Sequence, residues 1–279
     1  MTGRRPAPRR SSEYAWLITT PMAVFAAVCV AVFWVREPDW YQHWPGGLAT
    51  LAASVAAHVA VVNMVIRRQP MYVVVTEIPL ISALFFLPPA MTILAVTAAG
   101  AVTPLRSRTG ATKLWFNVAK AAAATSIAVL IVEPVRPLHA DSPGTWAILF
   151  TAAFASALFG HIAISGVMGM LQGRHAAQES FRAGLLALGI AAINIVIGLV
   201  FLVALNATPW AALLLSVLVV AMVLVFRSYA GFLRQHRTLA DVYELTLAVR
   251  EHGNDGGLAD VLLGRVRALM RCEHATLWL

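Results

Sequence analysis

The chain has 279 residues, of which 59% are apolar and only 12% are charged, and its mean hydropathy is +0.75. Because an average soluble domain is about half apolar and about a quarter charged, this composition excludes an ordinary soluble protein. The net charge of +8 does not indicate a nucleic-acid-binding protein, because the basic residues lie at the ends of the apolar runs. That arrangement is typical of membrane orientation.

The apolar runs have the length of membrane spans. About 18–20 residues cross ~30 Å of hydrocarbon at ~1.5 Å per residue. We predict a basic cytoplasmic tail in residues 1–14 and an all-α polytopic membrane helix bundle of about eight spans in residues 15–226. The predicted spans are residues 15–35, 48–66, 71–88, 90–105, 114–132, 146–168, 185–204 and 210–226.

The third and fourth spans come from one apolar tract, residues 71–105. As a single helix the tract would be ~52 Å long, which exceeds what a bilayer needs. Pro88 and Pro89 lie in its middle. A proline pair removes backbone donors and restricts the preceding residue, so it breaks a helix. We therefore predict two shorter helices joined by a tight turn.

The distribution of basic residues sets the orientation. Fourteen Lys and Arg residues near the membrane fall in segments on one side of this topology, and two, Arg36 and Arg136, fall on the other. Basic residues collect on the cytoplasmic side. The prediction is therefore a multi-pass protein of the plasma (inner) membrane, with both termini cytoplasmic and the lipid bilayer as its surroundings.

A polar segment compatible with one continuous helix follows the last span. Residues 227–251 contain no Gly or Pro after Gly231. Apolar and aromatic residues recur there at steps of three and four, which is typical of a coiled-coil seam. Two readings remain open, a signalling helix that forms a homodimer and a helix packed on its own soluble domain. The seam consists of Phe226, Tyr229, Leu233, His236, Ala240, Tyr243 and Leu247.

Residues 258–279 read as the start of a further domain. A cluster of turn residues at 252–257 ends the polar helix, and a second helical pattern covers residues 258–270. Residues 275–279 then read as a buried strand. An unpaired strand leaves its backbone donors and acceptors unsatisfied. We therefore expect these 279 residues to be part of a longer protein.

Residues 239–279, LADVYELTLAVREHGNDGGLADVLLGRVRALMRCEHATLWL, resemble the beginning of a GAF domain. Residues 242–249 are similar to the linker that precedes GAF in actinobacterial membrane proteins that continue into GGDEF and EAL domains. Two motifs of the membrane part are similar to the same family, Glu77-Ile78-Pro79 and Lys113-Leu114-Trp115-Phe116-Asn117. The resemblance implies a cytoplasmic helical linker and the truncated start of an α+β GAF-like domain.

The family includes diguanylate cyclases and cyclic-di-GMP phosphodiesterases, so the resemblance implies cyclic-di-GMP turnover as the output. The GGDEF and EAL motifs are absent from this sequence, and so are the common nucleotide, zinc-protease and hydrolase motifs. The chain as it stands is therefore predicted not to be an enzyme. No metal site or cofactor is predicted, because Cys29 and Cys272 are too few and too far apart to form a metal site.

Two charged residues fall inside predicted spans, Glu77 and Lys120. Each lies about six residues from the cytoplasmic end of its span, hence ~9 Å deep, so an ion pair is possible. The polar residues expected in the same layer are His58, Asn63, Asn117 and His161. One reading is a structural polar cluster, and the other is a ligand-sensing or proton-sensing pocket. Two single histidines are weak evidence for a haem site.

Other polar and small residues indicate helix packing. Asn194 in the seventh span is expected to form an interhelical hydrogen bond. Small residues in and just after the sixth span indicate close helix contact, because they let backbones approach. These are Gly160, Ser165, Gly166 and Gly169.

The function expected from these features is an integral membrane sensory or anchoring module. A stimulus would shift the last span, and residues 226–251 would carry the shift to a cytoplasmic domain. The alternatives are a small-solute transporter and a stand-alone membrane protein. Charged residues inside spans favour a transporter, but the sequence has no internal repeat that would support one. A lipid-modifying membrane enzyme is a third possibility, for which the sequence offers no convergent nucleophile, base or metal set.

The seam predicts that Leu233→Glu combined with Leu247→Glu weakens self-association, because two charges would enter an apolar contact. Sedimentation of the purified full chain in detergent measures the change. The same charges placed outside the seam, at Gln235 and Thr246, are the control. An unchanged dimer in the seam variant contradicts the coiled-coil reading.

Overall fold

The computed structural model describes residues 10–59, 62–66, 69–73, 75–106 and 110–208, together with 210, 211, 213–218, 220, 221, 224, 225 and 228. The chain divides into two compact units, Met1–Ala221 and Met222–Leu279. The helices and strands below all belong to the first unit. The predicted signalling helix, residues 227–251 with its seam, and residues 258–279 lie outside the described residues, apart from residue 228.

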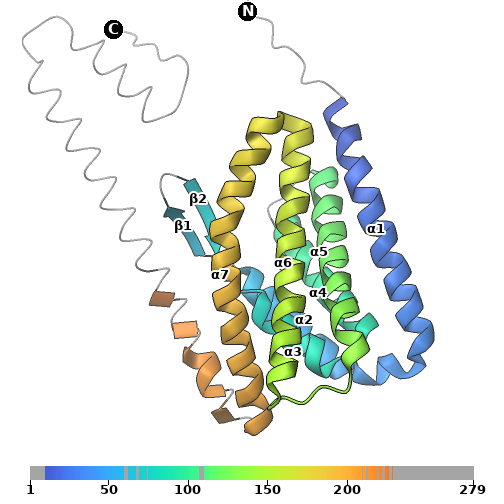
Figure 1. Cartoon of the computed structure of the whole chain (residues 1–279), viewed down its shortest axis with the longest axis vertical. Helices are drawn as coiled ribbons and strands as arrows, with labels where there is room; N and C mark the ends of the chain where they lie inside the picture. Colours follow the sequence, from blue (N-terminus) through green and yellow to red (C-terminus); the bar gives the residue numbers. More distant parts are fainter. Residues whose placement is uncertain are drawn as a thin grey trace, which may run out of the picture. The chain divides into compact units, whose positions relative to one another are not determined.

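The first unit is a helix bundle with one short hairpin (Figure 1). Its elements in order are α1 (Arg10–Arg36), the 3-10 helix η1 (Pro38–His43), α2 (Trp44–Val59), β1 (Val62–Ile66), β2 (Gln69–Val73), α3 (Glu77–Phe86), α4 (Pro89–Arg106), α5 (Ala111–Val132), the 3-10 helix η2 (Glu133–Val135), α6 (Pro143–Gln172) and α7 (Arg174–Ala207). The strands pair antiparallel, from Val62 with Val73 to Ile66 with Gln69.

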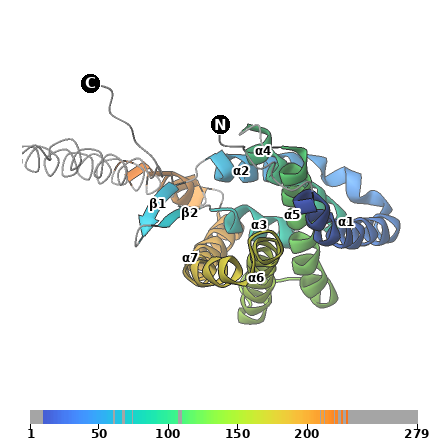
Figure 2. The same ribbon diagram turned by 90° about the horizontal axis from the view of Figure 1, so that it is seen from above.

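Helix α3 occupies the centre of the bundle. Seen from above, α6 and α7 lie on one side and α2 and α4 on the other, with α3 and α5 between them (Figure 2). Half of the ten residues of α3 are buried, and Ile81 and Leu84 are among the least exposed side chains. The main core cluster combines residues of α1, α3, α4, α5, α6 and α7. The short apolar helix therefore serves as a core around which longer helices pack.

Small residues set the close contacts between the helices. Gly198 of α7 faces α3, where an added Cβ would lie 2.7 Å from Ile81 Cδ1 and 3.2 Å from the Ile78 Cα. The buried face of α5 consists largely of alanine, with Thr125 and Ser126. In a bilayer, packing of this kind takes over from the hydrophobic effect as the source of helix association.

The close contacts predicted for the sixth span are confirmed at three of four positions. A Cβ at Gly169 would lie 3.1 Å from Ala177 Cβ, and one at Gly166 would lie 3.7 Å from Ile18 Cδ1. The Ser165 hydroxyl donates to the Ser180 hydroxyl of α7 at 3.4 Å. Gly160 has open space beside it. Gly173, which joins α6 to α7, has φ of 92°, a conformation that favours glycine.

The prediction of about eight spans is wrong. Four helices in the described part of the chain are long and apolar enough to cross a membrane: Trp16–Arg36, Ala111–Val135, Pro143–Gln172 and Arg174–Ala207. These four helices are consistent with a membrane protein. The described residues also contain no GAF-like α+β domain, so that part of the predicted fold is not found there.

The second and third predicted spans fail for a local reason. Val62–Ile66 and Gln69–Val73 contain Val, Ile and Tyr, which favour strands, and they form β1 and β2 instead of continuing α2 and α3. Helix α2 therefore ends at Val59, and α3 keeps ten residues. Hydropathy measures apolar content but not helix continuity. The prediction from apolar runs therefore included the two strands in spans.

The helix break predicted at the proline pair is confirmed. Helix α3 ends at Phe86 and α4 begins at Pro89. Since Pro88 has no N–H, the Leu84 carbonyl lacks its partner four residues ahead. Arg136 Nη2 donates to this carbonyl at 2.9 Å and to the Leu87 carbonyl at 2.8 Å. The Thr92 hydroxyl is within 3.2 Å of the Ala83 carbonyl and 3.1 Å of the Pro88 carbonyl.

We expect Arg136→Met to destabilise the bundle by about 2 kcal/mol, because the Leu84 and Leu87 carbonyls lose a charged donor. Arg36→Met is the matched control, since Arg36 is also an arginine beside a helix end but is exposed at the end of α1. Unfolding in one detergent under identical conditions measures both variants. Equal losses of stability in the two variants would show that Arg136 does not hold the turn.

Candidate functional site

The candidate site is the contact between the start of α3 and the middle of α7. Glu77 is the first residue of α3, and Asn194 of α7 is buried with 7% of its surface exposed. The Asn194 Nδ2 donates to Glu77 Oε2 at 3.2 Å. The interhelical hydrogen bond expected for Asn194 is therefore confirmed, and its acceptor is the acidic residue singled out in the sequence.

The local sequence favours Glu77 as the first residue of α3. An acidic side chain in the first turn of a helix interacts favourably with the helix dipole. Pro79 follows two residues later, and a proline is tolerated in the first turn because the N–H it lacks has no partner inside the helix. One turn beyond Asn194, Gly198 lies against the same end of α3. The hydrogen bond and the tight backbone contact therefore fix α3 on α7 together.

Lys120 and His161 form a second polar group, on α5 and α6. Lys120 is close enough to His161 to act on it electrostatically. The His161 ring packs against Gly184 of α7, where an added Cβ would lie 3.3 Å from Nδ1. No ion pair between Glu77 and Lys120 is found among the described residues.

The two polar groups lie at different levels. Gly184, beside His161, and Asn194, bonded to Glu77, are ten residues apart on α7. At ~1.5 Å per residue their levels differ by ~15 Å. The single layer expected from the span positions is therefore not formed. Helix α3 itself begins at Glu77, six residues later than the predicted third span.

The remaining predicted site residues do not join either group. His58 Nδ1 lies 2.8 Å from the Ser54 carbonyl of its own helix, and Asn117 Nδ2 donates to the Lys113 carbonyl of its own helix at 2.8 Å. Asn63 lies in β1, where it pairs with Tyr72. Of the six predicted residues, the structure brings only Lys120 and His161 together. Glu77 bonds Asn194 instead, two residues bond within their own helices, and one lies in a strand.

A group of charged residues at the opposite end of α3 was not predicted as a site from the sequence. Glu37, Glu133 and Arg136 come together there, and Arg136 Nε lies 3.2 Å from Glu133 Oε2. Burial, followed by the Glu133 carboxylate, raises the pKa of Glu37, against the opposing effects of Arg136 and His43. The proline pair could have indicated this group, because a helix that breaks inside a bundle leaves backbone carbonyls that need donors.

The chemistry of these groups favours a positional role. A carboxyl group bonded to a carboxamide supplies no nucleophile, and the described residues contain no group of three or more His, Cys, Asp or Glu side chains that could hold a metal ion. An acidic side chain inside a membrane bundle is costly and marks a functional position when it has a specific partner. Here the partner belongs to the longest helix, α7.

No family model, curated protein or solved structure matches this chain.

We predict coupling between Glu77 and Asn194 in a double-mutant cycle. Glu77→Leu and Asn194→Leu, alone and combined, should give an interaction energy of about 0.5–1.7 kcal/mol, the range for hydrogen bonds between membrane helices. The free energy of unfolding in detergent is the measurement. The control cycle pairs Glu77→Leu with Asn117→Leu, whose amide bonds its own helix. Similar values in both cycles would remove the specific role of Asn194.

Proposed function

We propose that this chain is the membrane-embedded sensory and anchoring module of a signalling protein, which transmits a signal through its last helix. The hydrogen bond between Glu77 and Asn194 carries this proposal. It joins a short central helix to a long helix that leads to the C-terminal part of the chain. A change in the protonation or solvation of Glu77 alters the contact that positions α7.

The packing around the hydrogen bond supports a switch with two arrangements. Gly198 lets the backbone of α3 approach α7 closely, so α7 cannot shift slightly without losing this contact. Packed helices of this kind change between discrete arrangements. Two arrangements that differ by a few kcal/mol are enough, provided that a stimulus interacts differently with each. Protonation of Glu77 would be such a stimulus, since it changes what the carboxyl group can donate and accept.

The proposed route continues beyond α7. Residues 210–226 form the predicted last apolar run, and residues 227–251 form the predicted polar helix that receives the movement. The surplus of basic residues at the ends of the apolar runs supports a location in the plasma (inner) membrane with both ends of the chain in the cytoplasm. The heptad pattern of residues 226–247 supports a homodimer. The resemblance of residues 239–279 suggests cyclic-di-GMP turnover as the output.

Cysteine cross-linking of the polar segment tests the relay. In a Cys29→Ala and Cys272→Ala background, Leu233→Cys reports the approach of two copies by the rate of disulfide formation in nanodiscs. We expect Glu77→Gln to change this rate by about fivefold, the effect of ~1 kcal/mol on the equilibrium. Glu179→Gln supplies the control, because Glu179 is an exposed carboxylate on α7, the helix that Glu77 contacts.

The outcomes separate the relay from its alternative. A rate that changes with Glu77→Gln but not with Glu179→Gln supports transmission from α3 to the polar segment. An unchanged rate in both variants contradicts it. Solute uptake into vesicles by the purified chain, abolished by Glu77→Gln, would favour a transporter in its place.

A further inference from the structure

The C-terminal ends of three helices meet at one end of the bundle. Glu37 follows the last residue of α1, and its N–H donates to the Phe33 carbonyl at 3.0 Å. Glu133 caps α5 in the same way on the Val129 carbonyl. Arg136 reaches the last carbonyls of α3, and the chain leaves α1 and α5 at the lower end of the bundle in Figure 1. Each of these helix ends carries a partial negative charge, roughly half an elementary charge.

Two carboxylates and one half-buried cation lie at this place in the described part of the chain. Arg136 Nε lies 3.2 Å from Glu133 Oε2, but both atoms are buried and neither forms a hydrogen bond within the described residues. The Arg136 guanidinium gives its hydrogen bonds to the Leu84 and Leu87 carbonyls instead. One guanidinium therefore balances Glu37, Glu133 and three helix ends, so negative charge is in excess among these half-buried groups.

The excess negative charge acts on the half-buried Glu37. Burial, followed by repulsion from the Glu133 carboxylate, raises the pKa of Glu37, while Arg136 and His43 oppose this effect. The folded chain therefore holds a proton at Glu37 more tightly than the unfolded chain does. The charged side chains around Glu37 are Glu133 and Arg136 beyond α5, His43 in η1, and the exposed Arg36 and Asp39 beside it in the sequence.

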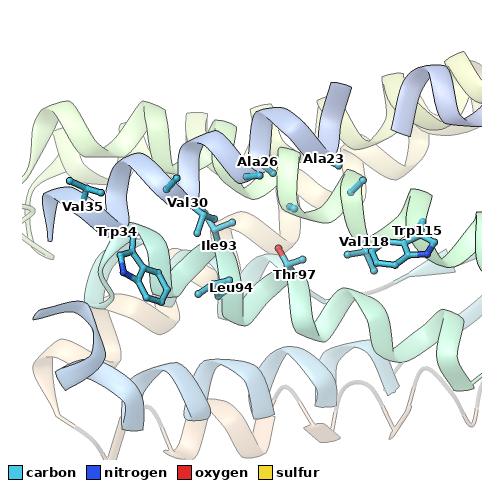
Figure 3. Close-up of a pocket in the computed structure, with 14 residues that line it drawn as sticks. Ala23, Ala26, Val30, Trp34, Val35, Ile93, Leu94, Thr97, Trp115 and Val118 are labelled. Carbon is cyan, nitrogen blue, oxygen red and sulfur yellow. The ribbon is translucent and has the colours of Figure 1, made fainter. Parts of the chain in front are cut away.

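Glu37 also lies in the turn that connects α1 to the end of α3. Its carbonyl accepts the N–H of Trp40, in η1, at 3.2 Å. Trp40 packs on the buried cluster at the end of α3, which includes Leu87. The ring centroids of Trp40 and Trp34 are 4.2 Å apart, and Trp34 stands at one end of an apolar groove of about 600 Å³ between α1, α4 and α5 (Figure 3). A change at Glu37 therefore reaches α3 by two routes, through Arg136 and through Trp40.

We propose that Glu37 is the proton-binding group of an acid-sensitive switch at the place where α1, α3 and α5 end. When Glu37 is ionised, it repels Glu133 and attracts Arg136, so the guanidinium is shared and its hold on α3 is loosened. When Glu37 takes up a proton, Arg136 serves Glu133 and the two carbonyls of α3, and the end of α3 is held firmly.

The switch lies at the opposite end of α3 from Glu77. In the orientation predicted from the basic residues, this end faces away from the cytoplasm, so the proton comes from outside. Neither the argument for the switch nor its test uses the relay through Asn194. Either proposal can therefore fail without the other.

The pH dependence has a definite sign. Because folding raises the pKa of Glu37, its ionisation costs stability, and this cost grows as the pH rises through the raised pKa. Glu37→Gln stays uncharged at every pH. We expect the ratio of the folding equilibrium constants of this variant and the native chain to rise about two- to fivefold from pH 4 to pH 8. The rise stays below the tenfold of one full pKa unit because Glu37 is partly exposed. Unfolding of the full chain in one non-ionic detergent measures the ratio.

Two further variants make this result specific. Asp39→Asn is the matched control, because it removes the same charge from an exposed side chain two residues away, and its ratio should stay constant over the same pH range. In a Glu133→Gln background the rise seen with Glu37→Gln should shrink, because the repulsion between the two carboxylates is gone. A constant ratio for Glu37→Gln, an equal rise for Asp39→Asn, or an undiminished rise in the Glu133→Gln background would overturn the proposal.

The reactivity of a buried thiol reports on α3 itself. In a Cys29→Ala and Cys272→Ala background, Leu87→Cys places a thiol at the buried end of α3, where its rate of reaction with a maleimide measures local opening. Chains with and without Glu37→Gln are compared at the same pH, so that the ionisation of the thiol cancels. The chain that retains Glu37 should react about two- to fivefold faster at pH 8, the same ratio as above, and equally fast at pH 4. Equal rates at pH 8 would show that ionised Glu37 does not loosen α3.

Discussion

Backbone carbonyls left free inside a membrane bundle must find donors, and this requirement organises the centre of the protein. The proline pair at residues 88–89 ends α3 after ten residues and leaves the Leu84 carbonyl without an N–H partner. Arg136 reaches back from the segment after α5 to supply that donor, and Thr92 serves the neighbouring carbonyls. A short helix can thereby remain buried among longer helices, with both of its ends tied to other parts of the bundle.

The two ends of α3 are held by different chemistry. At its last turn, the guanidinium of Arg136 bonds two carbonyls at 2.9 and 2.8 Å and pairs with Glu133. At its first turn, one hydrogen bond of 3.2 Å joins Glu77 to Asn194. The attachment at the first turn combines this hydrogen bond with the close contact of Gly198, and it contains a group that can gain or lose a proton. This asymmetry is the physical basis of the proposed relay from α3 to α7.

The bundle separates its polar and apolar features in space. The Glu77 contact lies on the side of α3 that faces α7, whereas the apolar groove lies between α1, α4 and α5. Lys120 and His161 lie ~15 Å from the level of Glu77 along α7. A carboxyl group bonded to the amide of another helix suits a change of packing.

Composition alone predicted a membrane protein, with which the four long apolar helices are consistent, and the proline pair predicted where the central apolar tract breaks. Both predictions depend on local chemistry. The sequence also marked Glu77 and Asn194 as costly polar residues in apolar surroundings. Only the tertiary structure decided their pairing, because the hydrogen bond joins residues 117 positions apart and depends on how α3 packs on α7. The span count failed for the same reason: apolar content measures the tendency to leave water, whereas the continuity of a helix depends on what each residue packs against.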